Sequence, residues 1–463
     1  MRRPACLDRH RPRRCPRHRP RRRLRTAAAS ALLPALLAVA AGAAPTGAAA
    51  ASHALDRAAL AEDLRAVHRA GVYGVFASVR DGAARWDGAA GFADRDTGRP
   101  VRADLRHRVG STTKSFTAVA VLQQNAAGRV DLDRPVGAYL PELVPGERGR
   151  KVTVRMLLNH TSGIADFLPD AFPSLRQNSP ASLDAERYRT VAPARLVAYG
   201  VGRPQLFEPG TDWSYSNTNY VVLGELLRAV TGRDPEQVIT EDVIRRAGLR
   251  DTYFPGTDPR IKGPHPRMYD AFFGRNDPPR DYSVYNMTWA GTAAALVSTA
   301  QDLDTFYRAL LRGALLPAAQ LDHMRATRPV EAPDGTVVLR YGLGLYSVDT
   351  PCGPAWGHDG LVWGAGTLAL SSPDGSRQIA LGLNLTKYHR LDEATGRPLP
   401  HPADAALEEL RDRALCGAAP TGPAAGRAWS APGPVTAGPV SARYGRPGAG
   451  RCRPGGRRPG RPR

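Results

Sequence analysis

The hydrophobic pattern at the start of the folded part changes from a helical spacing to an alternating one. Residues 54–68 place apolar side chains three and four positions apart, which predicts a helix. Residues 74–79 and 85–92 have the composition of strands, and the Asp81-Gly82 dipeptide between them is a turn signal. We therefore expect a helix followed by a β-hairpin.

From residue 111 to about residue 330 the apolar positions follow a helical period, and Pro and Gly separate the segments. The expected helices are residues 115–127, 155–158, 194–199, 219–231, 235–247 and 299–311. Strand patterns return afterwards at residues 336–346, 361–370 and 378–384, and residues 402–415 predict a closing helix.

The order of strands, then helices, then strands predicts an α+β fold. Residues 52–110 and 331–416 are expected to form an α/β part, in which helices flank an antiparallel sheet built from both chain ends. Residues 111–330 are expected to form a mostly helical domain inserted between them.

Positive charge is concentrated at the two ends of the chain. The net charge is +21 over 463 residues, but residues 1–26 hold twelve Arg and one Asp, and residues 417–463 hold nine Arg and no acid. The body is close to neutral, so no basic face for nucleic acid is expected. Residues 417–463 are also rich in Pro, Gly and Ala, which predicts a disordered extension.

The N-terminal 51 residues have the layout of a secretory signal peptide. An Arg-rich stretch ends at Arg25, an apolar run follows, and small residues continue to Ala51. The alternative is an uncleaved anchor, but the run is short and Ala-rich for a membrane span. We expect a secreted protein with no integral membrane span after signal removal.

The cysteines agree with export, which permits disulfides. Cys6 and Cys15 lie in the expected signal peptide. Of the remaining three, Cys352 and Cys416 are the expected pair, and Cys452 is left over in the C-terminal extension.

The first motif with chemical potential is Ser111-Thr112-Thr113-Lys114 at the start of an apolar helix. A spacing of three puts Ser111 and Lys114 on one helix face, and the helix N-terminus favours negative charge developing on Ser111. Burial would lower the pKa of the Lys114 ammonium and suit it to manage the serine proton. The alternative is that Ser111 only caps the helix.

Two further elements follow in the chain. Tyr215-Ser216-Asn217 lies in a turn-rich loop, where a phenol could move a proton and Asn217 could hold a substrate amide. In His358-Asp359-Gly360, His358 could supply a polar or cationic group, and Gly360 permits close backbone approach. Leu361 is expected to begin an edge-like strand whose N–H joins that of Ser111 in an oxyanion hole. Each element has a structural alternative, but their common order favours one active site.

With these three elements the sequence resembles the serine β-lactamase/DD-peptidase family, most closely its D-alanyl-D-alanine carboxypeptidases, which share a branch with class C β-lactamases. The resemblance covers roughly residues 55–416, and implies a β-lactamase/transpeptidase-like fold. It also includes residues 157–163, Trp289 before 291–294, residues 298–306, residues 341–345 and the positions of Cys352 and Cys416.

The resemblance implies a role for each motif residue and an enzyme without metal or cofactor. Ser111 would be acylated, and Lys114 and Tyr215 would manage its proton, in an order that the sequence leaves open. Asn217, His358, Gly360, Leu361 and Trp289 would contact a D-alanyl peptide, β-lactam or ester substrate. A monomer is expected.

Three positions depart from the carboxypeptidase pattern. Asp359 and Leu361 replace threonines, and Tyr346 replaces an arginine that binds the substrate carboxylate. Such a site should bind a carboxylate poorly. The primary expectation is a D-alanyl-D-alanine carboxypeptidase-like enzyme. An esterase or β-lactamase, a peptidase whose substrate lacks a free C-terminal carboxylate, and an inactive binding module are the alternatives.

Overall fold

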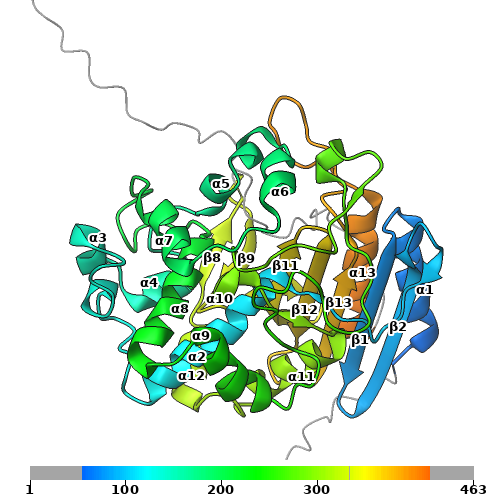
Figure 1. Ribbon diagram of the computed structural model, residues 1–463. Helices are drawn as coiled ribbons and strands as arrows, with labels where there is room; N and C mark the ends of the chain where they lie inside the picture. Colours follow the sequence, from blue (N-terminus) through cyan, green and yellow to red (C-terminus); the bar gives the residue numbers. More distant parts are fainter. Residues whose placement is uncertain (1–54, 333, 418–463) are drawn as a thin grey trace, which may run out of the picture. The chain divides into compact units, whose positions relative to one another are not determined.

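A nine-stranded sheet organises the chain (Figure 1). The computed structural model describes residues 55–332 and 334–417, so the expected signal peptide, the C-terminal extension and Cys452 lie outside it. From one edge to the other the strands are β3 (Arg99–Pro100), β2 (Ala84–Asp94), β1 (Gly74–Asp81), β13 (Arg377–Leu383), β12 (Ala365–Ser371), β11 (Gly353–Val362), β10 (Tyr346–Thr350), β9 (Val337–Tyr341) and β8 (Arg328–Glu331).

Neighbouring strands of this sheet run antiparallel. Strand β1 pairs with β13, so that Val75 lies opposite Leu383 and Asp81 opposite Arg377. The two ends of the folded chain therefore share one sheet, which confirms the predicted α+β architecture.

Helices cover both faces of the central strands. Because side chains alternate along a strand, Val75 and Val79 of β1 face α1 (Arg57–Arg69) and α13 (Pro402–Cys416), with which they share a hydrophobic core. Phe76 points to the other face, where its ring meets His107 edge-on. Helix α11 (Ala300–Leu311) contacts β1, β12 and β13. The central strands are consequently buried on both sides.

The remaining helices surround a second hydrophobic core, to which β11, β12 and β13 also contribute. These helices are α2 (Thr113–Ala126), α3 (Gly146–Lys151), α4 (Val154–Leu158), α5 (Leu168–Ala171), α6 (Ala181–Glu186), α7 (Pro193–Val201), α8 (Asn217–Thr231), α9 (Pro235–Ile239), α10 (Gly291–Ala294) and α12 (Ala318–Arg325). Short strands also form two small sheets, one of β14 (Leu385–Thr386), β5 (Tyr269–Asp270) and β6 (Arg280–Asp281), the other of β4 (His107–Arg108) and β7 (Val297–Ser298). Within residues 55–332 and 334–417, no helix has the length and apolar character needed to cross a bilayer.

Two of the predicted strands are in fact hairpins. The expected strand 336–346 is divided into β9 and β10, and the expected strand 361–370 contains the end of β11 and most of β12. Gly344 and Gly364 have φ of 70° and 77°, a backbone region that glycine enters without strain and that lets the chain reverse. Both turns lie inside apolar runs, so the hydrophobic pattern continues through them.

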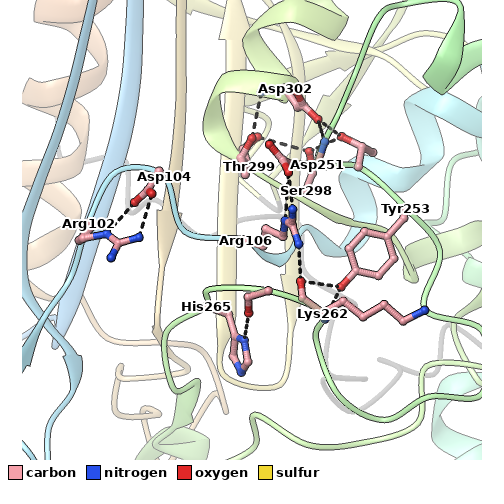
Figure 2. A network of polar contacts seen from close by, with 12 residues as sticks. Arg102, Asp104, Arg106, Asp251, Tyr253, Lys262, His265, Ser298, Thr299 and Asp302 are labelled. Carbon is pink, nitrogen blue, oxygen red and sulfur yellow. Dashed lines mark hydrogen bonds and ion pairs between the residues drawn. The ribbon is translucent and has the colours of Figure 1, made fainter.

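A polar network fixes the segment that leads to Ser111 (Figure 2). The Arg106 guanidinium pairs with Asp251 and donates a 2.7 Å hydrogen bond to the carbonyl of Lys262. The backbone N–H of Asp251 in turn donates to Asp302, at 2.7 Å. These contacts tie the chain just before β4 to α11 and to a loop of the helical part.

The disulfide prediction is confirmed. Cys352 and Cys416 are bonded, with their Cα atoms 5.5 Å apart. The bond joins the turn between β10 and β11 to the end of α13.

Candidate active site

Ser111 lies at the N-terminal end of α2, in a short 3₁₀ segment (Gly110–Thr112) that contacts β11. Ser111 is 9% exposed, so a small part of this otherwise buried residue remains accessible to solvent. Lys114 follows on the first turn of α2 and is completely buried. Sequence spacing alone placed these two residues on one helix face, and the structure agrees.

The Lys114 ammonium is held by three acceptors. Its Nζ donates to Ser111 Oγ at 3.1 Å, to Asn217 Oδ1 at 2.8 Å and to the backbone carbonyl of Ala293 at 3.0 Å. These acceptors come from the 3₁₀ segment before α2, from α8 and from α10, so the amine is fixed where these three segments meet. All three hydrogen-bond donors of the ammonium are used.

Burial lowers the pKa of Lys114 to about 7, because the charged form loses its hydration. The carboxylates of Asp166 and Asp359 act in the opposite direction but do not offset the burial. Near neutral pH a substantial fraction of Lys114 is therefore an uncharged amine, which can accept a proton from Ser111.

Tyr215 lies close to the same serine. The Lys114 Nζ is 4.7 Å from the centre of the Tyr215 ring, and the nearby Ser111 hydroxyl lowers the pKa of the phenol. Burial outweighs this effect and raises the pKa of Tyr215 well above its usual value. The phenol therefore keeps its proton over the physiological range.

Asn217 begins α8 and connects Lys114 to a carboxylate that the sequence analysis did not single out. Its Oδ1 accepts from Lys114, and its Nδ2 donates to Asp166 Oδ2 at 2.7 Å. Asp166 is half-buried, and burial raises the pKa of its carboxyl. Asp166 follows the Leu157–Gly163 run in the chain. It is an acid between the apolar residues Ile164–Ala165 and Phe167–Leu168, and this pattern could have marked it as a candidate site residue.

Strand β11 approaches the serine through a glycine. A Cβ atom on Gly360 would lie 1.9 Å from the carbonyl oxygen of Val109 and 3.0 Å from the backbone N of Ser111. A Cβ on Gly110, whose φ is 53°, would lie 2.8 Å from the backbone N of Leu361. The backbone N–H groups of Ser111 and Leu361 thus come from two segments that are in direct contact.

The expectation that Leu361 begins a strand is wrong, although its position is edge-like as expected. Leu361 is near the end of β11, which pairs with β12 through Val362 but with β10 only as far as Gly357. Beyond Gly357 the β10 side of the strand is open, and there it meets the 3₁₀ segment of Ser111. The open edge arises inside the sheet, because β10 begins only at Tyr346, opposite Gly357.

His358 lies beside the site, and of the two expected alternatives, a polar or a cationic group, the structure favours the polar one. Burial lowers the pKa of its imidazole to about 3. Its Nδ1 lies 2.6 Å from the backbone carbonyl of Asp359, which can only accept, so Nδ1 carries the proton. Nε2 then accepts from the Tyr341 hydroxyl at 2.9 Å. His358 is a neutral, doubly hydrogen-bonded side chain.

Asp359 adds a carboxyl group beside the reacting residues. It is 3% exposed, and burial raises its pKa to about 6, against the influence of the Tyr346 hydroxyl and the Lys114 ammonium. Among the described residues, Lys114 is the only cation whose charge acts on Asp359. The structure therefore shows an acid, without an arginine, on this strand.

Trp289 belongs to an aromatic cluster. The centre of its ring lies 4.2 Å from the ring centre of Trp363 and 5.6 Å from that of Phe172. Trp363 follows Leu361 by two residues, at the turn after β11. In the part of the chain that the structure describes, no hydrogen bond links the Trp289 side chain to another residue.

Ser111, Tyr215 and Asn217 thus lie around the amine of Lys114. Gly360 packs against the backbone of the serine segment. His358 lies beside them as a neutral residue, whereas Trp289 occupies a neighbouring aromatic cluster. Sequence reasoning missed the Asp166 carboxylate and the Ala293 carbonyl. A backbone carbonyl carries no sequence signal, so only the fold could reveal it.

Solved structures with similar folds include amide-cleaving enzymes. A D-stereospecific amidohydrolase from Streptomyces sp. is 37% identical and superimposes with a TM-score of 0.68, covering 79% of this chain and 100% of the other. A D-amino acid amidase from Ochrobactrum anthropi SV3 is 25% identical, with a TM-score of 0.61 and coverages of 71% and 91%.

Curated relatives match over shorter stretches. Esterase EstB of Burkholderia gladioli is 34% identical over 216 residues, which are 44% of this chain and 54% of the esterase. Penicillin-binding protein 4* of Bacillus subtilis is 28% identical over 162 residues, 35% of this chain and 33% of that protein. The match to the Beta-lactamase family itself spans residues 57–399. The chain therefore belongs to the Beta-lactamase family, as a serine hydrolase related to penicillin-binding proteins and to the class C-like branch.

Proposed function

We propose that this protein is a serine amidohydrolase that works through an acyl-enzyme on substrates without a free C-terminal carboxylate. The observation that carries the proposal is the environment of Asp359. A carboxylate-binding site needs a cation or several donors, whereas this strand presents a neutral His358 and an acid. A carboxylate placed there would meet like charge, so an amide or ester terminus fits better.

The proton path follows from the pKa values. Uncharged Lys114 accepts the Ser111 proton as Oγ attacks the substrate carbonyl, and a covalent acyl–oxygen bond forms. The amine or alcohol leaves after receiving a proton, for which the neutral Tyr215 phenol is the available donor beside Lys114. The Lys114 ammonium then returns its extra proton to Tyr215. Water attacks the acyl carbon, the bond to Ser111 Oγ breaks, and the water proton passes through Lys114 to Oγ, so that Ser111 is restored and the acid product departs.

The backbone supplies the groups for the oxyanion. The N–H groups of Ser111 and Leu361 come together because glycines occupy positions 110 and 360. Both donors are fixed before the substrate arrives, so stabilising the charged intermediate requires little reorganisation.

The relatives support cleavage of amide bonds in D-amino acyl substrates. The amidohydrolase from Streptomyces sp. is named as D-stereospecific, and its whole length is matched. A D-aminopeptidase of Brucella anthropi is 32% identical over 178 residues. We therefore propose a D-amino acyl group as the part transferred to Ser111, in preference to a strict D-alanyl-D-alanine carboxypeptidase. Esterase activity is the second candidate, favoured by the 34% identity to EstB.

A matched pair of substrates tests the proposal. A D-alanyl-D-alanine peptide and the same peptide with its C-terminal carboxyl amidated differ only in that charge. We expect a higher kcat/KM for the amidated peptide, and acylation of Ser111 visible as a mass increase that Ser111→Ala abolishes. A higher kcat/KM for the free carboxylate would support the carboxypeptidase instead. Nitrocefin and a short acyl ester in the same assay rank the β-lactamase and esterase activities.

Failure of Ser111 to react with any of these substrates, or with a fluorophosphonate, would favour an inactive binding module. We also propose that the protein is exported and acts as a monomer. The Cys352–Cys416 bond supports export, since disulfides persist in oxidising compartments. Sedimentation of the purified protein tests the monomer.

A further inference from the structure

The carboxylate of Asp166 lies on the far side of Asn217 from the reacting amine. Lys114 donates to one end of the Asn217 amide, and the other end donates to Asp166 Oδ2 at 2.7 Å. Asp166 is half-buried, whereas Asn217 and Lys114 are buried. It therefore lies at the more open end of a chain of contacts that starts at Ser111.

The hydrogen bonds of Asp166 leave part of its capacity free. Oδ1 accepts from the backbone N–H of Leu168 at 3.0 Å, and Oδ2 accepts from Asn217. Both donors are neutral, while a carboxylate has about four acceptor positions. Among the described residues, no cationic side chain forms an ion pair with Asp166 within 4.0 Å. A half-buried carboxylate without an ion-pair partner is suited to receiving a cation from solution.

The position of Asp166 identifies which part of a substrate it would meet. Under the proposed function a D-amino acyl group stays on Ser111. Asp166 is linked to Ser111 through Asn217 and Lys114, so we place that acyl group beside Asp166. The other carboxyl near Lys114, that of Asp359, is 3% exposed and lies on β11. Of the two residues, Asp166 is therefore the one with the larger exposed fraction.

We propose that Asp166 binds the free α-ammonium group of the residue whose carbonyl acylates Ser111. The ammonium of an unblocked amino acyl substrate would donate a charge-assisted hydrogen bond to Asp166. The enzyme would then act on amino acid amides and esters, or on the N-terminal residue of a peptide, in preference to N-acylated substrates. This inference rests on the proposed function and names its substrate class.

The test compares D-alanine p-nitroanilide with N-acetyl-D-alanine p-nitroanilide. We expect the wild type to prefer the free amine by about tenfold or more in kcat/KM. Asp166→Asn should lower kcat/KM for the free amine at least about tenfold more than for the N-acetyl substrate, chiefly through KM. Asp166→Glu, which keeps the charge, should retain a preference for the free amine.

A purely structural role predicts a different pattern. If Asp166 only positions Asn217, Asp166→Asn lowers both activities by the same factor, and the inference is overturned. Asp170→Asn is the matched control, because Asp170 lies four residues away and pairs with Arg176 and Arg203. It should leave the substrate preference unchanged, and thermal unfolding of each variant reports folding separately.

Mass spectrometry of Ser111 separates the two proposals. Acylation by the N-acetyl substrate, with no preference for the free amine, keeps the serine amidohydrolase and overturns the ammonium site. Acylation by neither substrate overturns both. A wild-type preference for the N-acetyl substrate also counts against Asp166 as an ammonium acceptor.

Discussion

Gly360 of β11 packs directly on the backbone of Val109, so that a Cβ at position 360 would lie 1.9 Å from the Val109 carbonyl oxygen. This contact sets how closely the strand approaches the nucleophile, because Val109 is two residues before Ser111. The absence of a side chain on Gly360 therefore sets the spacing between β11 and the segment that leads to α2.

Gly360→Ala should lower kcat at least about 100-fold, since displacing one oxyanion donor has an effect of that order. It should also lower the free energy of unfolding by about 1–3 kcal/mol through overpacking. Gly366→Ala on β12 is the control, because its Cβ would meet Leu383 at an ordinary 3.5 Å. Steady-state kinetics and denaturant unfolding of both variants test this. Equal activities in the two variants would refute the close approach.

The rate of Ser111 acylation should rise with pH through about 7. Lys114 must be uncharged to accept the serine proton, and burial lowers its pKa to about 7. Stopped-flow acylation between pH 5 and 9, measured with a neutral ester substrate, reports this ionisation. An acylation rate that is flat across this range would exclude Lys114 as the proton acceptor.

The free energy of unfolding should also depend on pH through the pKa of Lys114. The pKa of Lys114 is about 7 in the folded protein and 10.5 as its unperturbed value, so the unfolded chain binds more protons between these pH values. The free energy of unfolding contributed by this residue therefore rises with pH from about 7 to 10. Compared with Lys114→Met, the wild type should be least stable below pH 7 and gain steadily above it. Urea unfolding at pH 6 and 9 measures the change, and a pH-independent difference would contradict it.

Removing the Asp359 charge should improve binding of a carboxylate. Asp359→Asn is expected to raise kcat/KM about tenfold for a peptide with a free C-terminal carboxylate at pH 8, and to leave the amidated peptide nearly unchanged. Because the pKa of Asp359 is about 6, the wild type should discriminate less between the two peptides at pH 5. Asp349→Asn, at an exposed position of β10, serves as the control. An unchanged ratio in Asp359→Asn would show that this charge does not set specificity.

Loss of the disulfide should destabilise the protein without altering the site. Cys352 and Cys416 are 64 residues apart, and the chain-entropy contribution for such a loop is about 4 kcal/mol. Cys352→Ser and Cys416→Ser should each lower the unfolding midpoint in denaturant, and should do so equally. The kcat at 25 °C should stay within about twofold. A large fall in kcat at full folding would indicate that the bond also shapes the active site.

The sequence by itself determined the local chemistry of this protein. The Ser111–Lys114 spacing, the Tyr215–Asn217 loop and Gly360 were readable, because each depends on residue types a few positions apart. The α+β layout followed from the order of strand and helix patterns, and the Cys352–Cys416 pair was foreseen. The β9–β10 and β11–β12 turns were missed, since glycine turns interrupted apolar runs without polar residues.

Only the tertiary structure decided the charge states and the partners of the polar groups at the site. His358 looked like a possible cation, yet burial beside Tyr341 leaves it neutral. The Ala293 carbonyl joined the site only through the packing of α2, α8 and α10, and Asp166 through the contact of the segment before α5 with α8. The pKa of a side chain and the partners of a carbonyl depend on which distant segments exclude water from them. That information resides in the folded contacts and not in the order of residues.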